Sequence, residues 1–344
     1  MIHSTTKQAS IYLLLSLALI ACKGTDATNP SVQNAPDETY NALFTFKSGL
    51  VGSSISHSLA LPDGRTLWLY SDGFIGTAND DRSTSVDKIT AVRNAGMIQA
   101  DKLFTTLNAT EQGKAKNLVE ATTVGDHLSL AHGAVSGGNI EVLTHEFNIT
   151  QRFLKLNLAT FSFPTLKFIS LVELKNPIGI TYGDYIYSDN NYHYIFGRET
   201  RGTDMKIHVA RATLGKLGNQ ALWQYYNGSE YDNDATKSIA IFNTSARQFS
   251  VVKINDQFKI ILQKDKNVIA YSAPILVGPY DTGKTLFSIP DSNPTSNAFV
   301  HTQFTTKDGQ YLLSYDVQNL GTQNQNFLKN VDLFRPKFYR HNLQ

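Results

Sequence analysis

Three carboxylic acids lie at or near the ends of apolar runs that are typical of strands. Asp72 follows the run 67–70, Glu199 follows the run 192–196, and Asp184 precedes that second run. Two carboxyl groups about 5 to 9.5 Å apart can cleave a glycosidic bond when one donates a proton and the other attacks or activates water. We therefore predict Asp72 as base or nucleophile and Glu199 as general acid, two roles that could be exchanged. Asp184 would keep Glu199 protonated by like-charge repulsion.

Other side chains could bind a sugar around such a pair. Arg93 and His301 are candidates for contacting hydroxyl groups or orienting a carboxylate, and Trp68 for stacking on a sugar ring. The structural alternatives stay open, because buried polar groups are often satisfied inside a fold and strand aromatics often pack in the core. The acidic loop 230–234 has oxygen ligands that could hold a structural calcium ion, although a solvated loop is the simpler interpretation.

Two motif matches do not carry the chemistry that their letters suggest. Residues 278–285 fit the phosphate-binding pattern G-x-x-x-x-G-K-[ST], but a strand-like run with Pro290 follows where that site needs a helix. Residues 134–138 faintly resemble a serine-hydrolase elbow, but they lie between two strand patterns and indicate a hairpin turn. We therefore expect no nucleotide to bind.

The elements that must position the candidate acids are short strands. Apolar or alternating runs separated by Asp-Gly and Asn-Asp turns continue from residue 40 to the C-terminus, and strand groups recur every 55 to 60 residues or so. This period predicts an all-β five-bladed propeller, with a β-sandwich as the alternative. The expected blades are residues 50–105, 118–175, 178–222, 236–288 and 295–340. Residues 40–47 would close the ring, and 110–119 and 213–218 are the best helical candidates.

Several phrases, in order along most of residues 50–340, resemble five-bladed propeller families related to family 43 glycoside hydrolases. The nearest are the DUF4185-like and DUF5005-like groups, of which the former is associated with endo-acting hydrolysis of D-arabinan. The similar phrases are RTLWLYSDGFIG from Arg65, LNLATFSFPTL from Leu156, YIFGRE from Tyr194 and YLLSY from Tyr311. Arg93-Asn94 matches a family position before a small residue. The resemblance implies a glycan hydrolase acting on a furanoside-containing, arabinan-like polysaccharide, with Asn94 beside Arg93 in substrate binding. Ser71 and Gly73 depart from the pattern around Asp72, so a non-catalytic glycan-binding or scaffold protein is the alternative.

The N-terminus indicates export. Residues 11–21 form an apolar run shorter than the 20 or so residues that span a bilayer, as in a signal peptide. The run ends in Leu-Ile-Ala-Cys22, which resembles the bacterial lipobox, and Cys22 is the only cysteine of the 344 residues. We expect cleavage before Cys22, its lipidation, and a tether over residues 22–39 that carries a single domain, 40–344. The absence of aspartate after Cys22 favours the outer over the inner membrane of a bacterial cell envelope.

The composition excludes several classes of protein. With one cysteine, the chain can form neither an internal disulfide framework nor a thiolate metal cluster. A formal net charge of +2 with 17% charged residues gives no electrostatic footprint for nucleic acid. Hydrophobic content of 41% is enough for a large core. We expect a monomer whose partners are a glycan and, through the anchor, a membrane.

Overall fold

A computed structural model of the protein describes residues 35–176, 179–201 and 204–343. The predicted signal peptide, Cys22 and most of the predicted tether lie outside these residues. Among the described residues, no helix is long and apolar enough to cross a membrane. The described chain consists of short antiparallel strands and a few helical turns.

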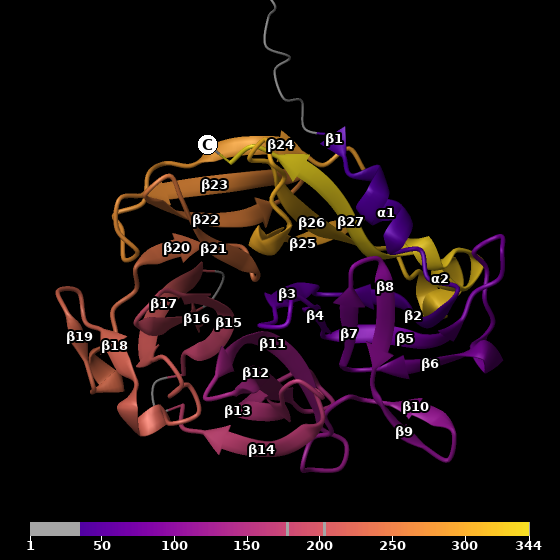
Figure 1. The fold of residues 1–344 in the computed structure, drawn as a ribbon, viewed down its shortest axis with the longest axis horizontal. Coiled ribbons are helices and arrows are strands. Elements are labelled where there is room, and N and C mark those ends of the chain that lie inside the picture. The colour runs from indigo at the N-terminus through magenta and orange to yellow at the C-terminus, as the bar shows by residue number, and fades with distance from the viewer. Residues whose placement is uncertain (1–34, 177–178, 202–203, 344) are drawn as a thin grey trace, which may run out of the picture. The chain divides into compact units, whose positions relative to one another are not determined.

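Five antiparallel sheets form successive blades (Figure 1). Their strands in chain order, with β1 completing the fifth blade, are as follows: β3 (His57–Ala60), β4 (Thr66–Tyr70), β7 (Ala95–Ala100) and β8 (Leu103–Leu107); β11 (His127–Ser136), β12 (Asn139–Phe147), β13 (Phe153–Ser162) and β14 (Phe168–Leu174); β15 (Thr181–Ser188), β16 (Tyr192–Arg201), β17 (Asp204–Thr213), β18 (Gln224–Tyr226) and β19 (Tyr231–Asp232), with β20 (Phe242–Thr244) also on β17; β21 (Phe249–Ile254), β22 (Gln257–Lys264), β23 (Asn267–Ala273) and β24 (Lys284–Ser288); β25 (Thr295–His301), β26 (Tyr311–Gln318), β27 (Phe334–His341) and β1 (Ala35–Pro36).

Smaller elements join the blades. A three-stranded sheet of β2 (Ser48–Ser54), β5 (Asp72–Thr77) and β6 (Ile89–Val92) extends the first blade, and β9 (Ala109–Glu111) pairs with β10 (Lys114–Lys116). The α-helices are α1 (Glu38–Leu43) and α2 (Gln325–Lys329). Single 3₁₀ turns are η1 (Val86–Lys88), η2 (Gln220–Leu222), η3 (Ala235–Lys237), η4 (Thr302–Phe304), η5 (Thr322–Asn324) and η6 (Val331–Leu333).

The innermost strands close a ring. Each of β3, β11, β15, β21 and β25 contacts the next, and β25 returns to β3. The predicted five-bladed propeller is confirmed. The β-sandwich alternative is excluded because five separate sheets surround a ring of innermost strands, where a sandwich has two sheets packed on each other. The expected limits hold for the first and last blades. The third blade extends past residue 222 to include β18, β19 and β20, so the fourth begins with β21 and not at residue 236, and the second begins with β11 and not at residue 118. Between blades, apolar side chains interdigitate as separate core clusters, such as the one around Leu143, Ile195 and Trp223.

Three local expectations are wrong. Residues 40–47 do not form the closing strand: most belong to α1 and the turn after it, and β1 instead pairs with β27, Ala35 opposite Arg340. The last residues of the predicted tether are therefore part of the folded domain. Residues 110–116 belong to the β9–β10 hairpin, because Gln112 and Gly113 both adopt positive φ, as a tight hairpin turn requires. Residues 213–218 form turns.

The two rejected motifs behave as expected. The G-x-x-x-x-G-K-T segment leads into strand β24, which begins at Lys284, and so lacks the helix N-terminus that would hold a phosphate. Residues 137–138 form the hairpin turn between β11 and β12, where both glycines have positive φ.

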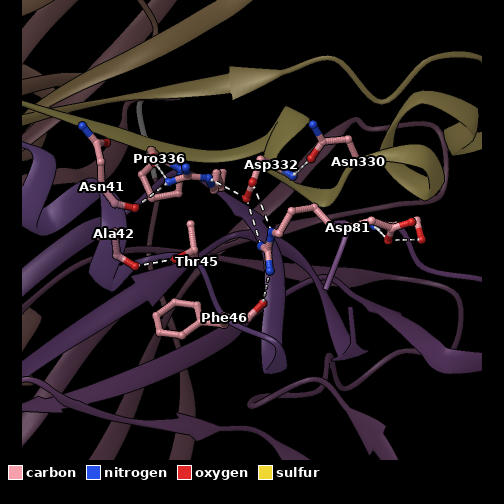
Figure 2. Close-up of polar contacts among 11 residues, drawn as sticks. Asn41, Ala42, Thr45, Phe46, Asp81, Asn330, Asp332 and Pro336 are labelled. Atoms are coloured by element: carbon pink, nitrogen blue, oxygen red, sulfur yellow. Dashed lines mark hydrogen bonds and ion pairs between the residues drawn. The ribbon is translucent and has the colours of Figure 1, made fainter. Parts of the chain in front are cut away.

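A polar cluster fastens the last blade to the β2–β5–β6 sheet (Figure 2). Arg82, between β5 and η1, donates to both oxygens of Asp332 in η6, at 3.1 and 2.9 Å, and to the carbonyl of Phe46. Asp332 also forms an ion pair with Arg335 of β27 at 2.9 Å, and Arg335 donates to the carbonyl of Asn41. The cluster joins segments almost 300 residues apart. Because its side chains are largely buried, solvent screens their charges less than it would at the surface.

Candidate active site

Asp72 and Arg93 meet in an open pocket of about 660 Å³. Asp72 opens β5 and Arg93 follows the end of β6, its pairing partner. Arg93 Nη1 lies 3.2 Å from Asp72 Oδ1, and both side chains are about half exposed. The sequence prediction that these residues share a site is consistent with this geometry. The other lining residues are Ser54, Gly73, Phe74, Ala91, Val92, Asn117, Gln318, Leu320, Asn324 and Phe334.

The chemistry of this pocket suits a sugar. The aromatic residues Phe74 and Phe334 are buried and belong to the pocket wall, while Asn117, Gln318 and the ion pair supply polar groups. A sugar ring has apolar C–H surface as well as hydroxyl groups, so its binding site needs both aromatic and polar side chains. Partial removal from water raises the pKa of Asp72, and Arg93 opposes that rise. Because of this shift, the Asp72 carboxyl group keeps its proton, and can donate it, up to a higher pH than an ordinary aspartic acid.

Asn94 and Trp68 are not available to substrate, and their predicted binding roles are corrected. Asn94 is fully buried: its side chain donates to the carbonyls of Val119 and Leu128 and accepts from the Val119 N–H. Trp68 is also fully buried, and its indole N–H donates to Gln99 at 2.9 Å. Asn94 therefore secures the connection to the second blade, and Trp68 belongs to the core.

His301 is a structural residue as well, against the prediction that it binds substrate. Its Nδ1 lies 2.6 Å from Ser58 Oγ and its Nε2 lies 2.8 Å from Ser314 Oγ, so both ring nitrogens are occupied. Burial lowers the pKa of His301 to about 3. The ring is therefore neutral at physiological pH and ties the innermost strands of the first and fifth blades together.

A bulge in β15 contains Asp184, whose buried side chain lies against Arg198 of β16. The register shifts between Tyr182 and Tyr185, and Gly183 has φ of 106°, where an added Cβ would lie 2.6 Å from Leu143 Cβ. Both Asp184 oxygens accept hydrogen bonds from Arg198, at 2.6 and 2.8 Å. The predicted role of Asp184 is thereby corrected: a carboxylate neutralised by a bidentate guanidinium is a poor source of repulsion, and it serves instead to fix Arg198.

Glu199, next to Arg198 in β16, lies against His208 of β17. Glu199 Oε2 is 3.5 Å from His208 Nε2, and the carboxylate is largely buried. His208 Nδ1 in turn lies 3.0 Å from Ser238 Oγ. Blade three thus supplies a carboxylate with an imidazole neighbour, and the sheet extension of blade one supplies Asp72. That these two acids face a single substrate stays a prediction.

A fourth carboxyl group, Asp316, was missed by sequence reasoning. It lies in β26, fully buried, where Oδ2 accepts from the N–H of Ile55 at 2.6 Å and from Asn297 Nδ2 at 3.0 Å. Burial raises the pKa of Asp316 to about 7. Ile55 has φ of 58°, an unfavourable conformation for a β-branched residue, and its bond to Asp316 helps to hold it. The one sequence signal is an acid inside the strand-like run 311–317, in which Ser314 is the other polar residue.

Metal ligands do not gather in the described part of the chain. No group of three or more His, Cys, Asp or Glu side chains there could hold an ion. In the loop considered for calcium, Asp232 pairs with Lys237 at 2.6 Å, and Asp234 accepts from the N–H of Thr236 to cap η3. Asp232 and Asp234 are therefore bound by neighbouring residues of the same loop.

The comparison with family models decides the relationship of this chain. The sequence matches the model described as Domain of unknown function (DUF5005) over residues 37–342. The chain belongs to this family. The match spans all five blades and includes Asp72, Asp184, Glu199 and Asp316. Curated proteins give no match.

Solved structures show the same fold. A protein from Bacteroides ovatus ATCC 8483, described provisionally as a hydrolase, has a TM-score of 0.76 and 22% identity, covering 91% of this chain and 92% of that one. An exo-β-1,3-galactanase from Phanerochaete chrysosporium has a TM-score of 0.49 and 11% identity, over 86% and 64% of the two chains. The catalytic domain of a Coprinopsis cinerea GH62 α-L-arabinofuranosidase has a TM-score of 0.47 and 8% identity, over 85% and 91%. With TM-scores below 0.5, neither of the last two adds to the fold assignment.

Proposed function

We propose that this protein is an exported, lipid-anchored glycoside hydrolase that acts on a furanoside-containing polysaccharide at the Asp72 pocket. The observation that supports it best is the pocket itself, in which a carboxyl group of raised pKa stands beside a guanidinium and an aromatic wall. The sequence resemblance to arabinan-acting propellers supplies the furanoside class. The signal-like N-terminus and Cys22 support export and lipidation, with the outer membrane as the proposed location.

In this proposal the raised pKa of Asp72 favours the exchanged assignment. Asp72 donates a proton to the glycosidic oxygen, and Glu199 attacks the sugar or activates water from the other side. Arg93 keeps the Asp72 carboxyl group oriented and stabilises its anion once the proton has left. Arg198 directly precedes Glu199 in the sequence and is held in place by Asp184. Its guanidinium group can contact a sugar hydroxyl. Separate environments for the two acids are what glycosidic cleavage requires.

A reducing-sugar assay on arabinan, arabinogalactan and galactan tests the activity. Asp72→Asn and Glu199→Gln should each lower turnover by at least about a hundredfold, the lower range for losing general acid–base catalysis. Asp63→Asn is the matched control, since Asp63 also pairs with an arginine, Arg65 at 2.6 Å, but in the turn between β3 and β4. The control should keep full turnover.

The melting temperature separates catalysis from stability. If either acid variant unfolds early while its residual turnover per folded molecule is normal, that carboxylate is structural and the proposed mechanism fails. A second function, glycan binding without cleavage, is favoured by one observation: Asp72 and Asp184 are each ion-paired with an arginine. Binding of arabinan without any release of reducing ends would select it.

A further inference from the structure

A basic pocket of about 390 Å³ lies between the third and fourth blades. Lys206 of β17 and Lys264 of β22 line it, together with polar groups that include Ser245 and Tyr271. No aspartate or glutamate is among its lining residues. The nearest acid along the sheet is Glu199, which stands opposite Lys206 in the register of β16 and β17. Two lysines that line one cavity concentrate positive charge there, so an anion bound in the cavity would be attracted by both.

This pocket continues into the Asp72 pocket through a third one. Ser245 lines both the basic pocket and a neighbouring pocket of about 430 Å³, which carries Arg247. Gln318 lines both that neighbour and the Asp72 pocket. The three therefore adjoin one another along the end of the propeller at which the innermost strands begin. Such a groove suits a polymer better than a single sugar.

The charges along the groove are unequal. Its cations are Lys206, Lys264, Arg247 and Arg93, against two carboxylates, Asp72 and Asp265. In the Asp72 pocket the charges pair with each other, so the excess of positive charge lies at the Lys206 and Lys264 end. Lysine binds carboxylate, sulfate and phosphate groups as a point charge, and the hydroxyls of Ser245 and Tyr271 can donate hydrogen bonds to the same oxygens.

We propose that the groove binds a glycan chain that carries anionic groups, with Lys206 and Lys264 as the anion site. The inference rests on the proposed function and narrows its substrate class to an acidic, furanoside-containing polysaccharide. Arg247 and Gln318 then line the path by which the same chain reaches Asp72.

Affinity electrophoresis through gels that contain polysaccharide tests the proposal. Polygalacturonate and its fully methyl-esterified form share a backbone and differ in charge, as do dextran sulfate and dextran. The full chain should be retarded by the acidic member of a pair and much less by its neutral match. Retardation by polygalacturonate alone assigns the anion as a carboxylate, and retardation by dextran sulfate alone assigns it as a sulfate; either supports the anion site.

The lysine variants locate the interaction. Lys206→Gln with Lys264→Gln should weaken binding of the acidic polymer about tenfold or more, the loss expected for about 1.4 kcal/mol. The control is Lys253→Gln with Lys307→Gln, which removes the same charge. Lys253 lines a cavity at the opposite end of the innermost strands, and Lys307 is exposed in the turn before β26. The control should bind as the unmodified protein does.

Several results would overturn the inference. Equal retardation by charged and neutral members of each pair would refute it while leaving a neutral-glycan hydrolase intact. Equal weakening in the control variant would show a general charge effect without an anion site. Equal binding of polyglutamate would show that the groove does not select a glycan. Failure to bind or cleave any polysaccharide, neutral arabinan included, would overturn the proposed function itself.

Discussion

Replacing Asp316 with asparagine should remove the pH dependence that this buried carboxyl group adds to the free energy of unfolding. Burial raises the pKa of Asp316 from its ordinary 3.8 to about 7. The folded chain therefore holds this proton more tightly than the unfolded chain does. The stability that results is fully present below pH 3.8, is lost as the pH rises to about 7, and is absent above it.

The interval between the two pKa values sets the size of the effect. At about 1.4 kcal/mol for each pKa unit, it corresponds to about 4 kcal/mol. An asparagine side chain has nearly the same shape and can accept the same hydrogen bonds from Ile55 N–H and Asn297. The difference in unfolding free energy between Asp316→Asn and the unmodified protein should therefore shift by about 2 to 4 kcal/mol in favour of the variant between pH 4 and pH 8.

Urea titrations at several pH values across this range measure the effect. Taking the difference between two proteins cancels the contribution of the buried histidines, which titrate in both. Asp308→Asn, in an exposed turn of the same blade, controls for the loss of a surface charge. A difference that is the same at pH 4 and pH 8 would refute the reasoning, because it would mean that Asp316 ionises alike in the folded and unfolded chains. Unchanged urea dependence of the unfolding free energy would confirm that both proteins unfold to the same extent.

Three further outcomes are expected. His132 is buried beside His57, and burial lowers the pKa of its imidazole to about 4. Folding stability should therefore be lost as the pH falls from 6.5 to about 4. In acid titrations His132→Gln should remove about 3 kcal/mol of that loss, and an unchanged acid transition would contradict this. Asp332→Ala leaves Arg82 and Arg335 without their carboxylate partner and should lower the unfolding free energy by about 2 to 3 kcal/mol in urea. A neutral result would mean that the cluster in Figure 2 contributes little. Cys22→Ala should abolish labelling by a palmitate analogue and release the protein from the membrane fraction; a variant that stays labelled would disprove lipidation at Cys22.

The sequence by itself determined the blades. Short alternating runs and turns such as Asp63-Gly64 depend on neighbours a few residues apart, and local patterns of this kind can be recognised without the fold. The number of blades and the limits of the first and last were therefore predicted. The border between the third and fourth was not, because β20 is defined by its pairing with β17. The closing strand was not predicted either, because β1 is only two residues long and is defined by its distant partner β27.

Only the tertiary structure decided which polar residues can meet a ligand. Asp72 and Arg93 are 21 positions apart and share a pocket because β5 pairs with β6. Asn94, one residue after Arg93, is instead buried, and its side chain forms hydrogen bonds toward the second blade. Asp316 acquires its raised pKa from burial among strands of two blades, which no stretch of sequence encodes. Burial and charge pairing are set by contacts between residues far apart in the chain, and those contacts exist only once the ring has closed.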